Sequence, residues 1–187
     1  MLNFYNLSAP DFVQLSRDIV QKITGVTMEI TDAANDRGAD IRDKMIGPSV
    51  VAQVKHYIKS TVSQLMASLR AEVPNFEALR PEQYFLFVSK DLTEARMQEV
   101  TQMFCQDEPL EERYIFTLSR LDTLLQESEY REILQKYPQL WDFSVDVLVD
   151  VMHRHISFDS EELLSAAERC QEFVPTGVYQ TCLETLE

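Results

Sequence analysis

Residues 50–57, with the sequence VVAQVKHY, constrain the fold of this chain more than any other segment. Their β-branched content predicts a strand, but Gln53 and Lys55 interrupt its apolar run. Residues two apart on a strand share one face, so both polar side chains point to the same side of the predicted sheet. A polar face on a buried strand indicates a functional site.

The segments around this strand predict an α/β fold. Ser8 and Asp11 have the spacing of a capping box, and apolar residues recur behind them every three or four positions, which predicts a first helix over 8–24. The same criteria predict further helices over 58–73 and 92–104, and strands over 26–30, 50–57, 84–90 and 114–120. This order, α-β-β-α-β-α-β, predicts a sandwich with a central mixed sheet.

Beyond residue 120 the pattern becomes helical, with segments over 121–137, 140–156 and 160–173. We therefore predict an α/β domain over residues 1–120 and a helical connector over 121–187. The last helical pattern simply stops at residue 187, which leads us to expect that the chain is part of a longer protein.

Composition favours a soluble cytoplasmic protein. The 187 residues are 45% hydrophobic, enough for a core, and no apolar run reaches the roughly 20 residues that span a bilayer. The N-terminus lacks the basic and apolar regions of a signal peptide, so we expect no membrane partner. Cys105, Cys170 and Cys182 are widely separated, which predicts reduced thiols, as in a cytosol.

The net charge of −14 is unevenly distributed along the chain. Residues 1–106 hold 11 Lys/Arg and 13 Asp/Glu, whereas residues 107–187 hold 6 and 18. The acidity therefore belongs almost entirely to the C-terminal part, which would repel a polyanion. The nearly neutral N-terminal part can still present a local basic face, although scattered solubilising charges would explain the same composition.

Asp40, Gln53 and Lys55 are the candidate catalytic residues. A hairpin around Gly47 would place the strand that starts at Asp40 beside residues 50–57 and bring the three side chains together. Asp40, the Gln53 side-chain oxygen and the Val54 backbone carbonyl would then offer oxygen ligands to a hard cation, Mg²⁺ or Mn²⁺. Lys55 would orient the attacking water and offset charge on a phosphate. On spacing alone, chance occurrence and an ordinary edge-strand lysine explain the pattern better than a catalytic site does.

Four motifs together give the chain a resemblance to a known family. LSAPDFVQLSRDIV, NDRGADI, VAQVKHY and EQYFLFVSKDLT occur in this order and resemble the Mrr-like branch of the PD-(D/E)XK restriction-endonuclease superfamily over about residues 7–104. The resemblance implies a restriction-endonuclease-like sandwich and Mg²⁺-dependent cleavage of double-stranded DNA. It also implies that Asp40, Gln53 and Lys55 form the catalytic motif.

One departure from the family pattern concerns the first helix. These nucleases often carry an acidic residue there after a phenylalanine, whereas Phe12 is followed by Val13. Asp18 or Asp36 could substitute. A solvated helix residue is the plainer interpretation of Asp18, whereas a metal ligand and a turn-forming residue are equally good interpretations of Asp36. The number of bound metal ions, one or two, is therefore open.

Residues near the catalytic strand are candidates for contacting DNA. His56 follows Lys55 but points to the opposite strand face, which favours a structural role over a DNA contact. Tyr57 and Lys59 could touch a phosphate.

The C-terminal segments SRLDTLLQESEYREILQKYPQLW and FVPTGVYQTCLETLE are similar to the segment that joins Mrr-like nuclease domains to STAND-type NTPases of bacterial anti-phage defence. This implies a nuclease effector whose full-length protein continues into an NTPase and a sensor module. Because duplex cleavage needs two strand scissions, we expect a dimer or larger homo-oligomer. Two alternatives remain: a catalytically inactive nuclease-fold module for nucleic-acid binding or oligomerisation, and a structural adaptor that assembles through residues 107–187.

Overall fold

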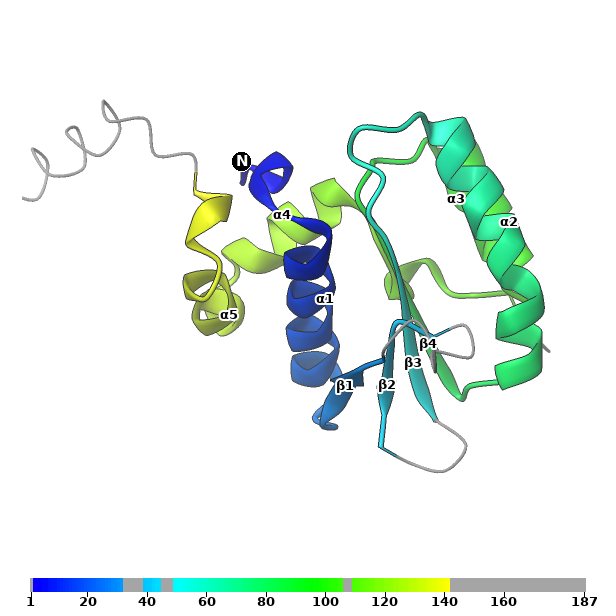
Figure 1. Cartoon of the computed structure of the whole chain (residues 1–187), viewed down its shortest axis with the longest axis horizontal. Helices are drawn as coiled ribbons and strands as arrows, with labels where there is room; N and C mark the ends of the chain where they lie inside the picture. Colours follow the sequence, from blue (N-terminus) through cyan, green and yellow to red (C-terminus); the bar gives the residue numbers. More distant parts are fainter. Residues whose placement is uncertain (1, 32–38, 45–48, 106–108, 142–187) are drawn as a thin grey trace, which may run out of the picture. The chain divides into compact units, whose positions relative to one another are not determined.

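Five strands form one mixed sheet in the order β1-β2-β3-β4-β5, seen nearly edge-on in Figure 1. The computed structural model of the chain describes residues 2–31, 39–44, 49–105 and 109–141. Strands β1, β2 and β3 are antiparallel, and β4 and β5 run parallel to β3. Their bounds are β1 Met28–Ile30, β2 Ile41–Asp43, β3 Val50–Lys55, β4 Gln83–Val88 and β5 Ile115–Phe116.

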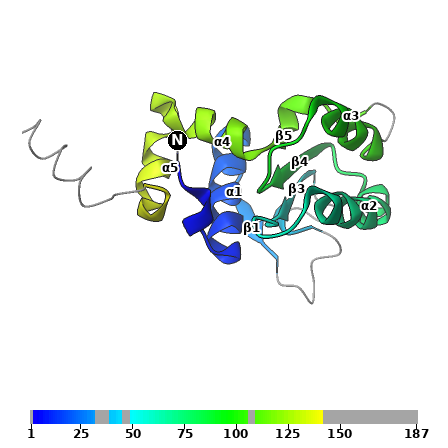
Figure 2. The ribbon, with the colours of Figure 1, turned by 90° about the horizontal axis from the view of Figure 1, so that it is seen from above.

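Helices cover both faces of this sheet. On one side lie α1 (Ala9–Thr24), α4 (Leu118–Gln126) and α5 (Arg131–Gln135), and on the other lie α2 (Val62–Leu79) and α3 (Glu94–Met103), as Figures 1 and 2 show. Short 3-10 turns occupy η1 Phe4–Asn6, η2 Glu112–Tyr114, η3 Ser128–Tyr130 and η4 Pro138–Leu140. The predicted class, α/β with a central mixed sheet, is confirmed.

The period-two alternation of β3 divides its side chains between two cores. Val50, Ala52 and Val54 belong to the core shared with α1, whereas Val51 belongs to the core shared with α2 and α3. Gln53 and Lys55 follow Val51 at intervals of two and therefore face α2. All six residues of β3 are buried, so this polar pair lies inside the protein rather than on a solvated sheet face.

Local sequence signals explain where the two longest helices begin and end. The Ser8–Asp11 capping box starts α1, and Gly25, with φ of 71°, ends it in a left-handed conformation. Thr61 and Gln64 form a second capping box that starts α2. The predicted helix over 58–73 was therefore placed too early and ended too soon, because α2 continues to Leu79.

The end of the described chain differs from the prediction in two ways. The strand expected over 114–120 is only Ile115–Phe116, and the helix expected over 121–137 is interrupted by η3. Both differences follow from packing, since the buried side chains of this segment reach the core that α1 covers: Leu121, Leu125, Tyr130, Ile133, Leu134, Tyr137 and Leu140.

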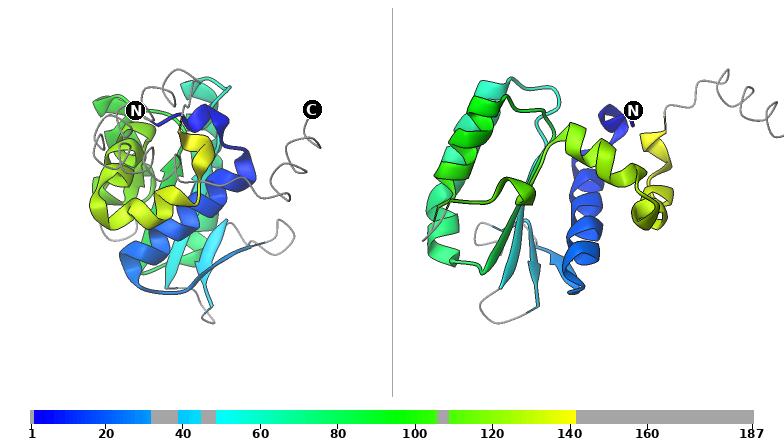
Figure 3. Two further views of the ribbon diagram at one scale, coloured as in Figure 1. Left: turned by 90° about the vertical axis from the view of Figure 1, so that its left-hand side faces the viewer. Right: turned by 180° about the vertical axis from the view of Figure 1, so that it is seen from behind.

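Residues 121–141 belong to the same compact unit as the sheet, and Figure 3 shows them beside α1. The Asn3 backbone N–H donates to the Leu140 carbonyl at 2.8 Å, which ties the first described residues to the last. This unit runs from Met1 to Asp142, so the predicted boundary after residue 120 falls inside it. The rest of the predicted connector lies outside the described residues. In the parts of the chain that the structure describes, no helix combines the length and apolarity needed to cross a membrane.

Candidate functional site

A hairpin positions Asp40 opposite the polar end of β3. Strand β2 pairs with β3 through Ile41 and Ala52, so Asp40, one residue before β2, continues this register opposite Gln53. Asp43 fixes the other end of the hairpin, because its Oδ2 accepts from the Ser49 hydroxyl at 2.7 Å and from the Ser49 backbone N–H at 3.2 Å. The expected pairing of the strand after Asp40 with residues 50–57 is confirmed.

The Asp40 carboxylate contacts β3 directly. Its Oδ2 accepts a hydrogen bond from Gln53 Nε2 at 2.6 Å and another from the Val54 backbone N–H at 2.7 Å. The backbone N–H and carbonyl of one strand residue point to the same neighbour, so the Val54 carbonyl also points toward the edge where Asp40 lies. The side chain of Gln53 is 4% exposed, and its Oε1 is a buried oxygen without a hydrogen-bond donor among the described residues.

Lys55, the last residue of β3, pairs with a carboxylate that the sequence analysis did not identify. Its Nζ lies 2.6 Å from Oε1 of Glu72 on α2, and the two side chains are 11% and 19% exposed. A second hydrogen bond, from Asn75 Nδ2 at 2.9 Å, holds the other oxygen of Glu72. The lysine therefore points into the protein rather than into solvent.

The ionisation of Glu72 depends on this pairing. Burial raises the pKa of the Glu72 carboxyl, but hydrogen bonds from Lys55 and Asn75 and the positive charge of Lys55 outweigh it, so the net pKa lies below the ordinary value. Glu72 is thus a carboxylate at neutral pH, and its charge lies against the Lys55 ammonium.

Tyr84 of β4 shows that both carboxylates act on the α2-facing side of the sheet. Burial raises the pKa of the Tyr84 hydroxyl well above its ordinary value, and the charges of Glu72 and Asp40 raise it further. Tyr84 pairs in register with Val51, on the strand face that also carries Gln53 and Lys55. The four candidate groups, Asp40, Gln53, Lys55 and Glu72, therefore share one region between β3 and α2.

Of the two acidic residues considered as substitutes for Val13, Asp18 is described by the structure and is not brought to this region. Asp18 is 8% exposed and binds Arg17 at 2.6 Å and Lys136 at 3.2 Å, on the α1 side of the sheet. Asp18 therefore does not lie near the site. The interpretation of Asp18 as a solvated helix residue is also wrong, because the side chain is buried and paired. Val13 packs against the core that α1 covers. Asp36 lies outside the described residues.

The residues predicted to contact DNA have different surroundings. The His56 ring packs against Phe12 with centroids 5.4 Å apart, and burial lowers the pKa of its imidazole, only partly opposed by a hydrogen bond to the Leu7 backbone. This agrees with the predicted structural role. The Tyr57 backbone N–H donates to the Ser89 hydroxyl at 2.5 Å, and Lys59 is exposed in the loop before α2.

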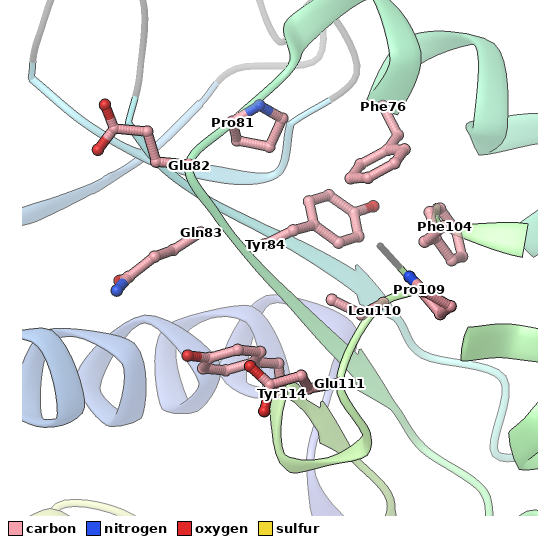
Figure 4. A pocket seen from close by; sticks show the side chains of 10 residues that line it. All are labelled: Phe76, Pro81, Glu82, Gln83, Tyr84, Phe104, Pro109, Leu110, Glu111 and Tyr114. Atoms are coloured by element: carbon pink, nitrogen blue, oxygen red, sulfur yellow. The ribbon is translucent and has the colours of Figure 1, made fainter. Parts of the chain in front are cut away.

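The largest aromatic cluster of this face lies at the other end of the strands. Figure 4 shows Tyr84 pointing toward Phe76 and Phe104, whereas Glu82 and Gln83 point away from them. Phe76, Tyr84 and Phe104, together with the loop at Pro109, line an open pocket of about 160 Å³. The pocket is beside the first residues of β4, whereas Lys55 pairs with Val88, the last residue of β4.

Glu72 had a sequence signal that could have revealed it. Leu65, Leu69 and Phe76 are buried on one stripe of α2, and Glu72 occupies the position between Leu69 and Phe76 with the same helical spacing. A carboxylate in an apolar stripe needs a partner of opposite charge, and Lys55 is a lysine in a strand expected to be buried. The two residues could therefore have been predicted to form an ion pair.

Comparisons with known proteins give one informative similarity. No family model matches the chain, and no solved structure matches it. The uncharacterized protein y4cD of Sinorhizobium fredii is 34% identical over 150 residues, which cover 80% of this chain and 23% of that protein. The chain thus spans about a quarter of the length of the curated relative that it matches.

Proposed function

We propose that this chain carries a metal-dependent DNA endonuclease domain of the Mrr-like branch, which hydrolyses phosphodiester bonds of double-stranded DNA. The observation that carries the proposal is the contact of Asp40 with Gln53, together with a buried Lys55 two residues further on the same strand face. The sheet order, an antiparallel β1-β2-β3 unit followed by parallel β4, supports a restriction-endonuclease-like sandwich.

The donor atoms of the site fit a small hard cation. Mg²⁺ prefers oxygen ligands and usually binds to few protein groups, with water and phosphate completing the octahedron. Asp40 offers a carboxylate, the Val54 carbonyl points to the same edge, and Gln53 Oε1 is a buried oxygen that a cation would satisfy. Among the described residues no three His, Cys, Asp or Glu side chains form a metal-binding group.

The chain's own residues supply the remaining chemistry. A bound Mg²⁺ or Mn²⁺ would act as a Lewis acid on the phosphate. Lys55, held inside the protein beside this region, would orient the attacking water and stabilise negative charge that develops on the phosphate. The Val54 N–H and the Gln53 amide fix the Asp40 carboxylate, so the metal ligand is positioned before substrate arrives.

The partners follow from the reaction. Cutting both strands of a duplex needs two sites, so we propose that the active form is a dimer or larger homo-oligomer. We further propose that the nuclease serves bacterial anti-phage defence in the cytoplasm, within a protein that continues into an STAND-type NTPase and a sensor. The similarity of the chain to 23% of a longer protein is compatible with such an arrangement.

A catalytically inactive nuclease-fold module is the second candidate. Two observations favour it: the first helix presents Val13 in place of an acid, and the charge of Lys55 is compensated by Glu72. In such a module the same groups would hold β3 to α2, and DNA would be bound without cleavage.

Cleavage of supercoiled plasmid separates these candidates. We expect the whole chain to nick plasmid in the presence of Mg²⁺ or Mn²⁺, and we expect EDTA to stop the nicking. The substitutions Asp40→Asn and Lys55→Met should each abolish it. Lys22→Ala removes an exposed lysine of α1 and is the matched control. If the wild type is inactive even after enforced dimerisation, the inactive module is correct. Nicking that survives both site substitutions would place the active site elsewhere.

A further inference from the structure

Glu72 is the charged residue of this region to which the proposed reaction gives no role. Its Oε1 lies 2.6 Å from Lys55 Nζ, and both side chains are largely buried. It comes from α2, seventeen residues after the lysine, and belongs to none of the motifs identified in the sequence.

Glu72 is itself held rigidly. Asn75, one turn further along α2, donates from Nδ2 to Glu72 Oε2 at 2.9 Å, so both carboxylate oxygens are engaged. The helix that carries these two residues is anchored to the sheet by Leu65, Leu69 and Phe76, all buried. The Glu72 carboxylate is therefore a fixed point opposite the end of β3.

Lys55 needs such a fixed point. The strand holds only the backbone of the lysine, and its four-carbon side chain has rotatable bonds that place the ammonium over a wide range of positions. A carboxylate at hydrogen-bond distance selects one of these positions. The same carboxylate also satisfies the ammonium where water is largely excluded.

The selected position lies within the region of Asp40 and Gln53. Gln53 and Lys55 occupy the same strand face, and Gln53 Nε2 contacts Asp40 at 2.6 Å. Asp40 contacts Gln53 and Glu72 contacts Lys55, so the two carboxylates lie against neighbouring positions of one strand face.

We propose that Glu72 is a positioning residue for Lys55, holding its ammonium beside the Asp40–Gln53 pair where the scissile phosphate would bind. This inference rests on the proposed nuclease function. It assigns to α2 a part of the active site that the strand motif alone does not supply. An ion pair that only ties α2 to β3 would affect folding but not the rate constant of cleavage by folded protein.

The test compares Glu72→Gln and Glu72→Asp with the wild type in the whole chain. Glu99→Gln is the matched control, because Glu99 pairs with Arg70 of α2 and with Arg96 of α3 away from the site. Plasmid cleavage is followed under single-turnover conditions, with Mn²⁺ affinity and thermal unfolding measured on the same samples. We expect Glu72→Gln to lower the cleavage rate constant about 10- to 100-fold, with KM and Mn²⁺ affinity within about twofold of wild type. Glu72→Asp should recover part of the rate.

Lysine reactivity provides a readout that does not depend on cleavage. With limiting acetic anhydride, Lys55 should react slowly in the wild type relative to the exposed Lys22, and faster in Glu72→Gln. Unchanged Lys55 reactivity, or an unchanged or increased rate constant in folded Glu72→Gln, would overturn the positioning role while leaving the nuclease in place. A wild type that neither binds Mn²⁺ nor cleaves would overturn the proposed function and this inference with it.

Discussion

Replacing Lys55 by methionine removes the ammonium from the site while keeping most of the side-chain volume. Glu72, whose side chain is 19% exposed in the wild type, then loses the ammonium and keeps the hydrogen bond from Asn75. Burial, which already favours the neutral acid, becomes dominant, so the pKa of Glu72 should rise above its ordinary value of 4.5. The substitution should therefore lower the free energy of unfolding most at pH values where Glu72 is ionised.

The expected magnitude follows from the pair's geometry. For charge centres about 4 Å apart and an effective dielectric constant of about 20, the attraction is about 4 kcal/mol. Desolvation of the two groups offsets roughly half of this, which leaves about 2 kcal/mol, in the range of hydrogen bonds between charged groups. In the wild type the lowered pKa of Glu72 contributes stability that is present above about pH 4.5 and is lost as pH falls through the folded-state pKa.

Urea unfolding of a double-mutant cycle measures this coupling. Lys55→Met, Glu72→Gln and the double variant should show an interaction free energy of about 2 kcal/mol at pH 7, which shrinks as the pH falls through the lowered folded-state pKa of Glu72. A coupling below about 0.5 kcal/mol at pH 7 would show that the Lys55–Glu72 pair does not stabilise the folded protein. A coupling that grows as the pH falls would show the same.

Three further predictions concern the scaffold. Burial raises the pKa of Asp18, but hydrogen bonds from Arg17 and Lys136 and their charges outweigh it, so the net pKa is lowered and its stabilisation is present above about pH 4. Asp18→Asn should lower the free energy of unfolding by about 1–2 kcal/mol at pH 7 and by less at pH 3, and an equal loss at both would contradict this. Arg80 ends α2 with φ of 45°, so Arg80→Gly should raise the free energy of unfolding by about 0.5–1 kcal/mol, and a loss would contradict the strain argument. Gly25, with φ of 71°, is the reverse case, and Gly25→Ala should lower the melting temperature.

Strand periodicity predicted the arrangement of the catalytic candidates well. The alternation in VVAQVKHY placed Gln53 and Lys55 on one face, and the turn at Gly47 predicted the pairing that brings Asp40 opposite Gln53. These relations are local, because they depend on a hairpin and on the fixed period of a strand.

Relations across the sequence were harder to predict. Glu72 reaches Lys55 only because α2 crosses back over β3, and the helix starts at Val62 rather than at residue 58. Asp18 was expected in solvent, but Lys136 and Tyr137 cover it from 118 and 119 residues away. For the same reason the compact unit that holds the sheet extends past residue 120, since residues of α4 and α5 belong to the core that α1 covers.

The central claim is that Asp40 and Gln53 form a divalent-cation site on β3. Mn²⁺ binding to the whole chain, measured by electron paramagnetic resonance titration, tests it most directly, with Asp40→Asn as the site variant and Asp18→Asn as the control for loss of a carboxylate elsewhere. We expect saturable binding by the wild type and by Asp18→Asn, displaced by Mg²⁺, and loss of that binding in Asp40→Asn. Equal binding by all three proteins, or no saturable binding by the wild type, would contradict it.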